Sequence, residues 1–164
     1  MASRLWVEVA GMRKTARHVR TMTEDPLATE IHLTHRRYIG RLAARIHEKA
    51  LELPIYRLVF ERLGLKGPIL AYLISHDELA LRTLPRNTLT RHYGLYHRPW
   101  RRRTIRGHLI IMLANTATLN KHPKYIKTYD DYQRRGKTHW KAVTRVALKI
   151  LRDIRQIARQ TSDT

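Results

Sequence analysis

The chain has 164 residues, with 33 lysines and arginines against 13 aspartates and glutamates, which gives a formal net charge of +20. The absence of cysteine excludes disulfides, zinc–cysteine sites and thiol catalysis. We expect no transmembrane helix, because no apolar run reaches about 18 residues, and no signal peptide. The length suits one domain, and the basic charge favours a polyanionic partner such as nucleic acid.

The first segment, residues 3–20, predicts a helix in which Leu5, Trp6 and Val9 are roughly in phase. Its other side carries several arginines, so we interpret residues 1–22 as a basic N-terminal helical arm that docks on DNA or on a partner. An ordinary first helix fits the pattern equally well. The rest, residues 23–164, predicts a single all-α domain.

A second helix is expected from Pro26 to about Leu51, because Pro26 suits a first helical position. Its apolar stripe comprises Ile31, Tyr38, Ile39, Leu42, Ala43, Ile46 and Ala50. Arginines near i, i+4 spacing form a basic face beside this stripe, which indicates a charged surface. These arginines are Arg36, Arg37, Arg41 and Arg45.

Short helices are predicted next, at 55–63, 69–74 and 79–84, with a polar turn at 76–78. Pro85 breaks the chain, and either Asn87 or Thr88 can cap the helix that follows.

Residues 97–103 form the densest cationic segment and surround a tryptophan. Arginines of this kind suit phosphate contacts. Trp100 either stacks on a base or anchors the loop to the core. The arginines assigned to phosphate here are Arg98, Arg101, Arg102 and Arg103, with Arg106 just beyond.

A central helix is expected from Thr104 to Leu119, because residues 108–114 are nearly all apolar. We predict that Ile105, Leu109, Met112, Leu113 and Thr116 face inward. A short helix follows at 125–135, and its end contributes two further candidate contacts, Arg134 and Arg135.

The last helix, predicted over 137–159, carries two parallel stripes. The apolar stripe runs from Trp140 through Val143, Val146, Ala147, Ile150, Leu151, Ile154 and Ile157 to Ala158. The cationic stripe supplies candidate contacts at Lys137, Lys141, Arg145, Lys149 and Arg152. Only Asp153 opposes these charges within the helix, so the stripe favours a bound polyanion.

No segment alternates with a period of two residues over a useful length. The sequence therefore predicts an all-α fold: a compact bundle of about six helices, with an N-terminal helical arm and a long basic C-terminal helix.

Candidate catalytic groups are few. Ser75, His76 and Asp77 are consecutive, whereas a triad needs groups that converge in space, so we interpret them as a helix cap. Neighbouring Asp130 and Asp131 would point in different directions. We therefore expect no enzymatic activity, no catalytic residue, no metal site and no cofactor.

Histidine and tyrosine pairs give only weak alternatives. His32 and His35 share a helix face without a carboxylate nearby, which is a poor zinc site. Tyr125, Tyr129 and Tyr132 stack on one predicted helix face, where packing is favoured over a nucleophilic role.

Three blocks between residues 63 and 159 resemble the C-terminal domain of insertion-sequence-110-type transposases. These blocks are Leu63–Ala71 with its Gly-Pro turn, Arg91–Leu95, and a terminal pattern of His122-Pro, Tyr125, Tyr129, Tyr132, Arg134–Lys137, Ala142 and Val146–Leu151. The resemblance implies a DNA-binding scaffold whose Gly-Pro turn presents backbone N–H groups to a phosphate. Lys66 departs from the usual glycine spacing.

The chain also departs from that family in its catalytic parts. Residues 1–62 are too short and too basic for the family's acidic RuvC-like domain, and residues 96–103 contain no serine where the family places a reactive one. The resemblance therefore implies DNA binding without the transposase chemistry.

These observations favour a structural double-stranded-DNA-binding protein that coats or packages DNA as a homo- or hetero-oligomer, in a virion as a nucleocapsid or capsid protein, or in a nucleoid. A transposition accessory or truncated transposase that binds specific DNA or a guide-like RNA is one alternative. A ribosomal or other structural-RNA-binding protein is another.

Overall fold

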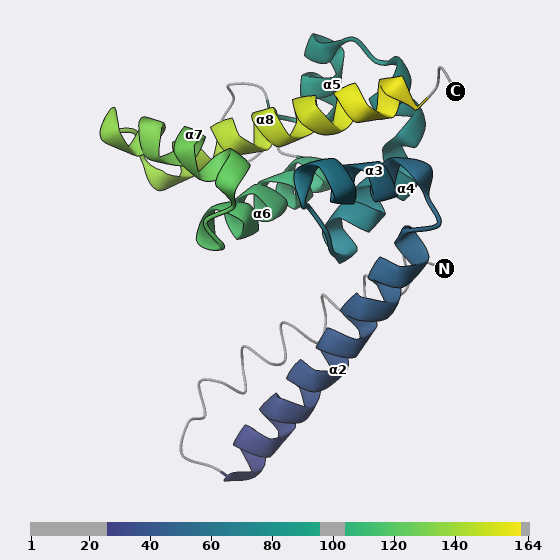
Figure 1. Ribbon diagram of the computed structural model, residues 1–164. Helices are drawn as coiled ribbons and strands as arrows, with labels where there is room; N and C mark the ends of the chain where they lie inside the picture. Colours follow the sequence, from purple (N-terminus) through teal and green to yellow (C-terminus); the bar gives the residue numbers. More distant parts are fainter. Residues whose placement is uncertain (1–25, 96–103, 162–164) are drawn as a thin grey trace.

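The computed structural model describes residues 26–95 and 104–161, and these residues form seven helices and no strand (Figure 1). The all-α fold class predicted from the sequence is therefore confirmed. Residues 1–22, the predicted arm, lie outside the described residues. The arginine-rich segment with Arg98, Trp100, Arg101, Arg102 and Arg103 also lies outside them.

Helix α8 (His139–Gln160) is the element against which most of the bundle packs. It contacts α3 (Pro54–Leu63), α4 (Pro68–Thr83), α6 (Ile105–Leu119) and α7 (Pro123–Arg134). Its apolar stripe is buried as predicted from Val143 to Ala158. Trp140 is the exception: this first-turn residue remains 45% exposed, so the buried stripe begins one turn later than predicted.

Helix α6 is central, since it packs against α4, α7 and α8, but the predicted inward face was wrong for three of its five residues. Ile105 is 74% exposed, and Met112 and Thr116 are exposed as well. Leu109 and Leu113 are buried as expected, together with Ile110, Ile111, Ala114 and Ala117. A helix that is apolar nearly all round has no polar face, so periodicity cannot select the side that is buried.

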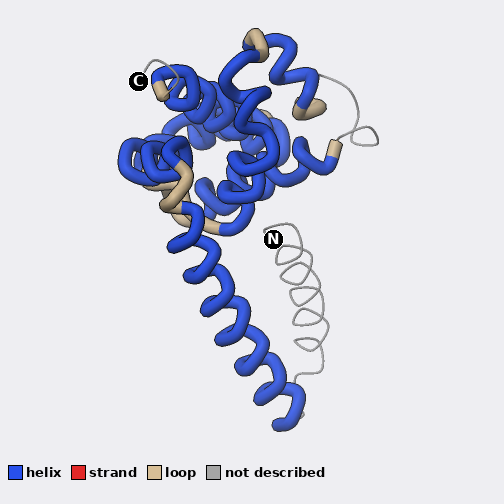
Figure 2. Tube along the Cα trace, turned by 90° about the vertical axis from the view of Figure 1, so that its right-hand side faces the viewer, coloured by secondary structure: helices blue, strands red, loops and turns tan. Residues whose placement is uncertain are grey.

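Helix α2 (Pro26–Ala50) leaves the body of the bundle as a rod, as both views show (Figures 1 and 2). Leu42 is its first buried side chain among residues 29–50. The part of the helix before Leu42 therefore extends about 24 Å at 1.5 Å per residue. Ile31 and Tyr38, which belong to the predicted apolar stripe, lie in this part and are 40% and 45% exposed.

Helix α4 spans the two short helices predicted at 69–74 and 79–84. It is kinked at Asp77, whose φ of −119° and ψ of 16° are not helical, so the predicted polar turn at 76–78 coincides with the kink between the two helical halves. The predicted caps for α5 (Arg86–His92) were wrong: Pro85 is the N-cap residue and provides no side-chain hydrogen bond, and Asn87 and Thr88 lie inside the helix.

Candidate nucleic-acid interface

The first group of cations is the α2 ladder, defined as Arg36, Arg37, Arg41 and Arg45. All four are exposed on the projecting rod, and none forms a hydrogen bond or ion pair within the described part of the chain. Cations at i, i+4 repel one another, so the ladder is destabilising until an anion approaches. The structure thus presents these four predicted contacts to solvent.

The second group is the α7–α8 cluster, defined as Arg135, Lys137, Lys141 and Arg145. The guanidinium carbons of Arg135 and Arg145 lie 5.9 and 5.8 Å from the centre of the Tyr132 ring, which brings the two helices' cations together. All four are exposed, and none pairs with a carboxylate of the described residues. Neighbouring Arg134 differs, because its Nη2 pairs with Asp131 Oδ1 at 2.6 Å.

Lys149 has an internal role that the stripe did not predict. Its Nζ donates to the Lys124 carbonyl and to Thr128 Oγ1, both at 3.1 Å, and it lies 5.8 Å from the centre of the Tyr125 ring. The half-buried ammonium therefore joins α8 to α7, and we remove it from the set of phosphate contacts.

Arg106 also turns inward. Its Nε donates to Asp77 Oδ1 at 2.7 Å, and Asp77 is only 3% exposed. His92 Nε2 lies 3.5 Å from the same oxygen, too far for a strong hydrogen bond. Burial raises the pKa of neighbouring Tyr93 well above its ordinary value, and the charge of Asp77 raises it further. Arg106 thus compensates a buried carboxylate, while its side chain is 43% exposed and the phosphate contact at this residue stays a prediction.

The buried carboxylate of Asp153 interacts with three side chains. Lys124 Nζ lies 3.2 Å from its Oδ2, and Tyr125 donates its hydroxyl to the same oxygen at 3.3 Å. Arg152 Nε is 3.4 Å from Oδ1, and the Arg152 side chain is 52% exposed. Because that contact is long, the Arg152 guanidinium remains available to an anion.

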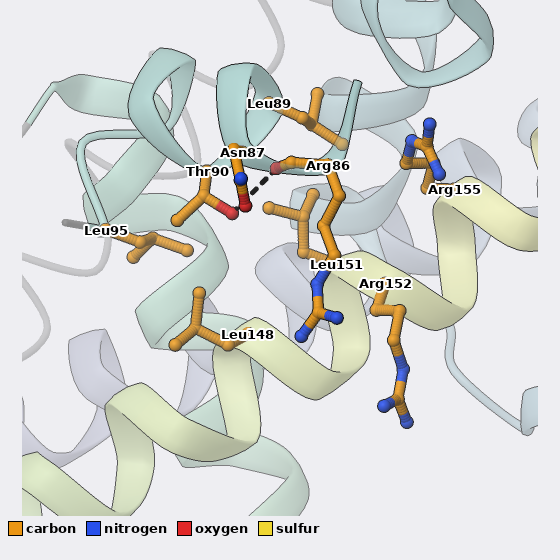
Figure 3. Close-up of a pocket in the computed structure, with 9 residues that line it drawn as sticks. All are labelled: Arg86, Asn87, Leu89, Thr90, Leu95, Leu148, Leu151, Arg152 and Arg155. Carbon is orange, nitrogen blue, oxygen red and sulfur yellow. Dashed lines mark hydrogen bonds between the residues drawn. The ribbon is translucent and has the colours of Figure 1, made fainter. Parts of the chain in front are cut away.

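A pocket of about 190 Å³ lies between α5 and α8, next to Arg152 (Figure 3). It is lined with Arg152 by Arg86, which the sequence did not single out, and by Arg155, which belongs to the cationic stripe of the last helix but was not among the candidate contacts. Arg86 and Arg155 are 69 positions apart in the chain, so only the fold brings them together. The sequence feature that could have pointed to this pocket is the cationic stripe of the last helix, which contains Arg155.

The Gly-Pro turn before α4 does not present a free first N–H group. The Gly67 N–H donates to Tyr56 Oη at 3.0 Å, and this oxygen lies 2.8 Å from His47 Nδ1. Gly67 has a φ of 111°, which a residue with a side chain rarely adopts. The turn fastens α4 to α3 and α2, so the predicted phosphate role for this N–H group is not supported.

The consecutive residues Ser75, His76 and Asp77 do not form a catalytic triad in the structure. Ser75 Oγ and His76 Nδ1 are 3.0 Å apart on the surface, but Asp77 points to Arg106 and does not orient the histidine. Asp77 also sits at the kink inside α4, so the predicted helix cap was wrong. No group of three or more histidine, aspartate or glutamate side chains there could hold a metal ion.

None of the described helices combines the length and apolar character needed to cross a membrane. The chain matches no protein-family model, no curated protein and no solved structure.

Proposed function

We propose that this chain is a non-catalytic, structural double-stranded-DNA-binding protein that coats or packages DNA in a virion or a nucleoid. The observation that carries the proposal is the pair of exposed cationic surfaces, the α2 ladder and the α7–α8 cluster. Each holds four cations without a carboxylate partner in the described chain. We further propose descent from a transposase domain, on the terminal motifs named above.

Binding would rest on counterion release at phosphates. If all eight cations contact phosphates, the logarithm of the binding constant falls with the logarithm of salt concentration with a slope of about −7. Neither surface offers the paired amide or carboxylate side chains that read base edges, so little sequence preference is expected.

Exposed apolar residues support assembly into an oligomer. Ile105, Met112 and Leu119 recur every seven residues on α6 and are 74%, 43% and 71% exposed. Ile31 and Tyr38 add further exposed apolar surface on the α2 rod. Apolar surface of this kind marks protein–protein contact sites, so subunits would pack through it while the cations follow DNA.

The deciding experiment compares random duplex DNA, single-stranded DNA and structured RNA across a salt series, with electron microscopy of the complexes. We expect steep, sequence-independent binding to duplex DNA and regular filaments. Discrete complexes on one sequence would instead support a transposition accessory, and a preference for structured RNA would support an RNA-binding protein.

The surfaces themselves are tested by changing four residues at a time. Replacing the α2 ladder by glutamines should reduce the salt slope to about −4, and replacing the α7–α8 cluster should do the same. Arg57→Gln is the matched control, because Arg57 is exposed on α3 and belongs to neither surface. An unchanged slope in both quadruple variants would refute this assignment.

A further inference from the structure

The α5–α8 pocket combines an apolar floor with a basic rim. Four leucines form the floor, two from the α5 side and two from α8, and three arginines also line the pocket (Figure 3). The floor comprises Leu89, Leu95, Leu148 and Leu151, and the rim comprises Arg86, Arg152 and Arg155. The rim therefore concentrates three positive charges at one concave site.

The three arginines differ in how firmly the protein holds them. Arg155 Nε donates to the Leu84 carbonyl at 2.9 Å, which fixes this side chain at the end of α4. Arg152 makes long contacts to Asp153 Oδ1, from Nε at 3.4 Å and from Nη2 at 3.5 Å. The guanidinium of Arg86 has no hydrogen bond or ion pair with any described residue, so its five N–H donors are open to a ligand.

Charge balance at the rim is poor. Asp153 is the carboxylate that reaches it, and that group is already shared with Lys124 and Tyr125. Burial lowers the pKa of Arg155, and the positive charges of Arg159 and Arg86 lower it further. An anion between these side chains would remove the repulsion and accept charge-assisted hydrogen bonds.

The size and the polar lining of the pocket limit the class of ligand that it can bind. A volume of about 190 Å³ is below the range of about 300–1,000 Å³ that is typical for drug-sized ligands. Thr90 donates its hydroxyl to the Arg86 carbonyl, whereas the side-chain amide of Asn87 has no partner among the described residues. A small oxyanion with several acceptor oxygens matches this set of donors.

We propose that the α5–α8 pocket binds one phosphate group through Arg86, Arg152 and Arg155, and that a backbone phosphate of DNA occupies it in the complex. The second half of this inference rests on the proposed function. The pocket would act as a fixed anchor, because Arg155 is positioned by Leu84 before the ligand arrives, unlike the solvated cations of the α2 ladder.

Inorganic phosphate tests the pocket without nucleic acid. We would measure the melting temperature in phosphate and in chloride at equal ionic strength, for the wild type, Arg86→Gln and the control Arg57→Gln. A ligand that binds only the folded state raises the melting temperature. Phosphate should raise it in the wild type and in Arg57→Gln, and this rise should be lost in Arg86→Gln. An equal rise in all three proteins, or no rise in the wild type, would refute the proposal that this pocket binds phosphate.

Duplex DNA tests the source of the phosphate. Arg86→Gln should make the salt slope shallower by about one, beyond any change in Arg57→Gln. If the phosphate-dependent stabilisation requires Arg86 but the slope does not change, the site takes a free phosphorylated molecule and the DNA assignment fails. If the wild type does not bind duplex DNA at all, the proposed function is refuted. The phosphate measurement still shows whether the pocket binds a phosphate group.

Discussion

The Nε atom of Arg106 donates a 2.7 Å hydrogen bond to Oδ1 of Asp77 and so joins the start of α6 to the kink of α4. Asp77 is 3% exposed, and a buried carboxylate is tolerated only with a compensating charge or hydrogen bonds. The non-helical backbone of Asp77 therefore lies where its side chain meets Arg106 of α6 and His92 of α5.

Arg106→Leu should lower the free energy of unfolding by on the order of 2 kcal/mol, because it leaves the Asp77 charge buried without its partner. Urea unfolding measures the loss. The double variant Arg106→Leu/Asp77→Asn should be more stable than the sum of the two single changes allows. Additive losses would show that the two side chains do not act as a pair.

Much of the fold was accessible from the sequence because its boundaries carry local chemical signals. Pro54 and Pro123 open helices, and Gly136, with a φ of 68°, follows the end of α7. Thr104 caps α6 by accepting a hydrogen bond from the Gly107 N–H. The polar turn predicted at residues 76–78 coincides with the kink at Asp77, but the pairing of Asp77 with an arginine 29 positions away carries no local signal.

The candidate site was accessible in part for a related reason. Cations at i, i+4 spacing predicted the α2 ladder and most of the α7–α8 cluster, because helix geometry alone aligns them. The same pattern could not separate Lys141, which stays exposed, from Lys149, which donates to a carbonyl 25 positions away. The sequence could not show that Arg86 and Arg155 line one pocket, because only the fold brings α5 next to α8.

Lys149→Met and Lys141→Met should therefore have opposite consequences. Lys149→Met removes two hydrogen bonds between α8 and α7 and should lower the free energy of unfolding by about 1–2 kcal/mol with little effect on the DNA salt slope. Lys141→Met should leave stability within about 0.5 kcal/mol and make the slope shallower by about one. Urea unfolding and DNA titration give both quantities, and a reversed pattern would contradict the assignment of the two lysines.

Gly107 allows the first turn of α6 to approach the chain at the end of α5. A Cβ atom added to it would lie 2.2 Å from the Tyr93 carbonyl oxygen, so the backbone would have to move. Gly107→Ala should lower the melting temperature, with a cost typical of overpacking, about 1–3 kcal/mol or more. Gly40→Ala is the matched control: nothing lies within 4 Å of its added Cβ, and stability should rise by up to about 1 kcal/mol. Equal effects of the two changes would show that the Tyr93 contact is not tight.

Tyr93 and Tyr125 should make the protein sensitive to high pH. Burial raises the pKa of both hydroxyls above the ordinary value near 10, and the charges of Asp77 and Asp153, respectively, raise them further. Above about pH 10 the unfolded chain loses these protons while the folded chain keeps them, so the unfolded state binds fewer protons. The stabilisation is complete below pH 10 and is lost as pH rises toward the folded-state pKa values.

Each tyrosine should contribute a decrease of about 1.4 kcal/mol in the free energy of unfolding per pH unit in that range. Urea unfolding between about pH 9 and 11 measures this slope in the wild type and in single Tyr93→Phe and Tyr125→Phe variants. Each substitution should make the slope shallower, because one linked proton is removed. Tyr38→Phe is the control, since Tyr38 is 45% exposed on α2 and should leave the slope unchanged. If the Phe variants keep the wild-type slope, lysine titration and not the buried hydroxyls governs alkaline unfolding.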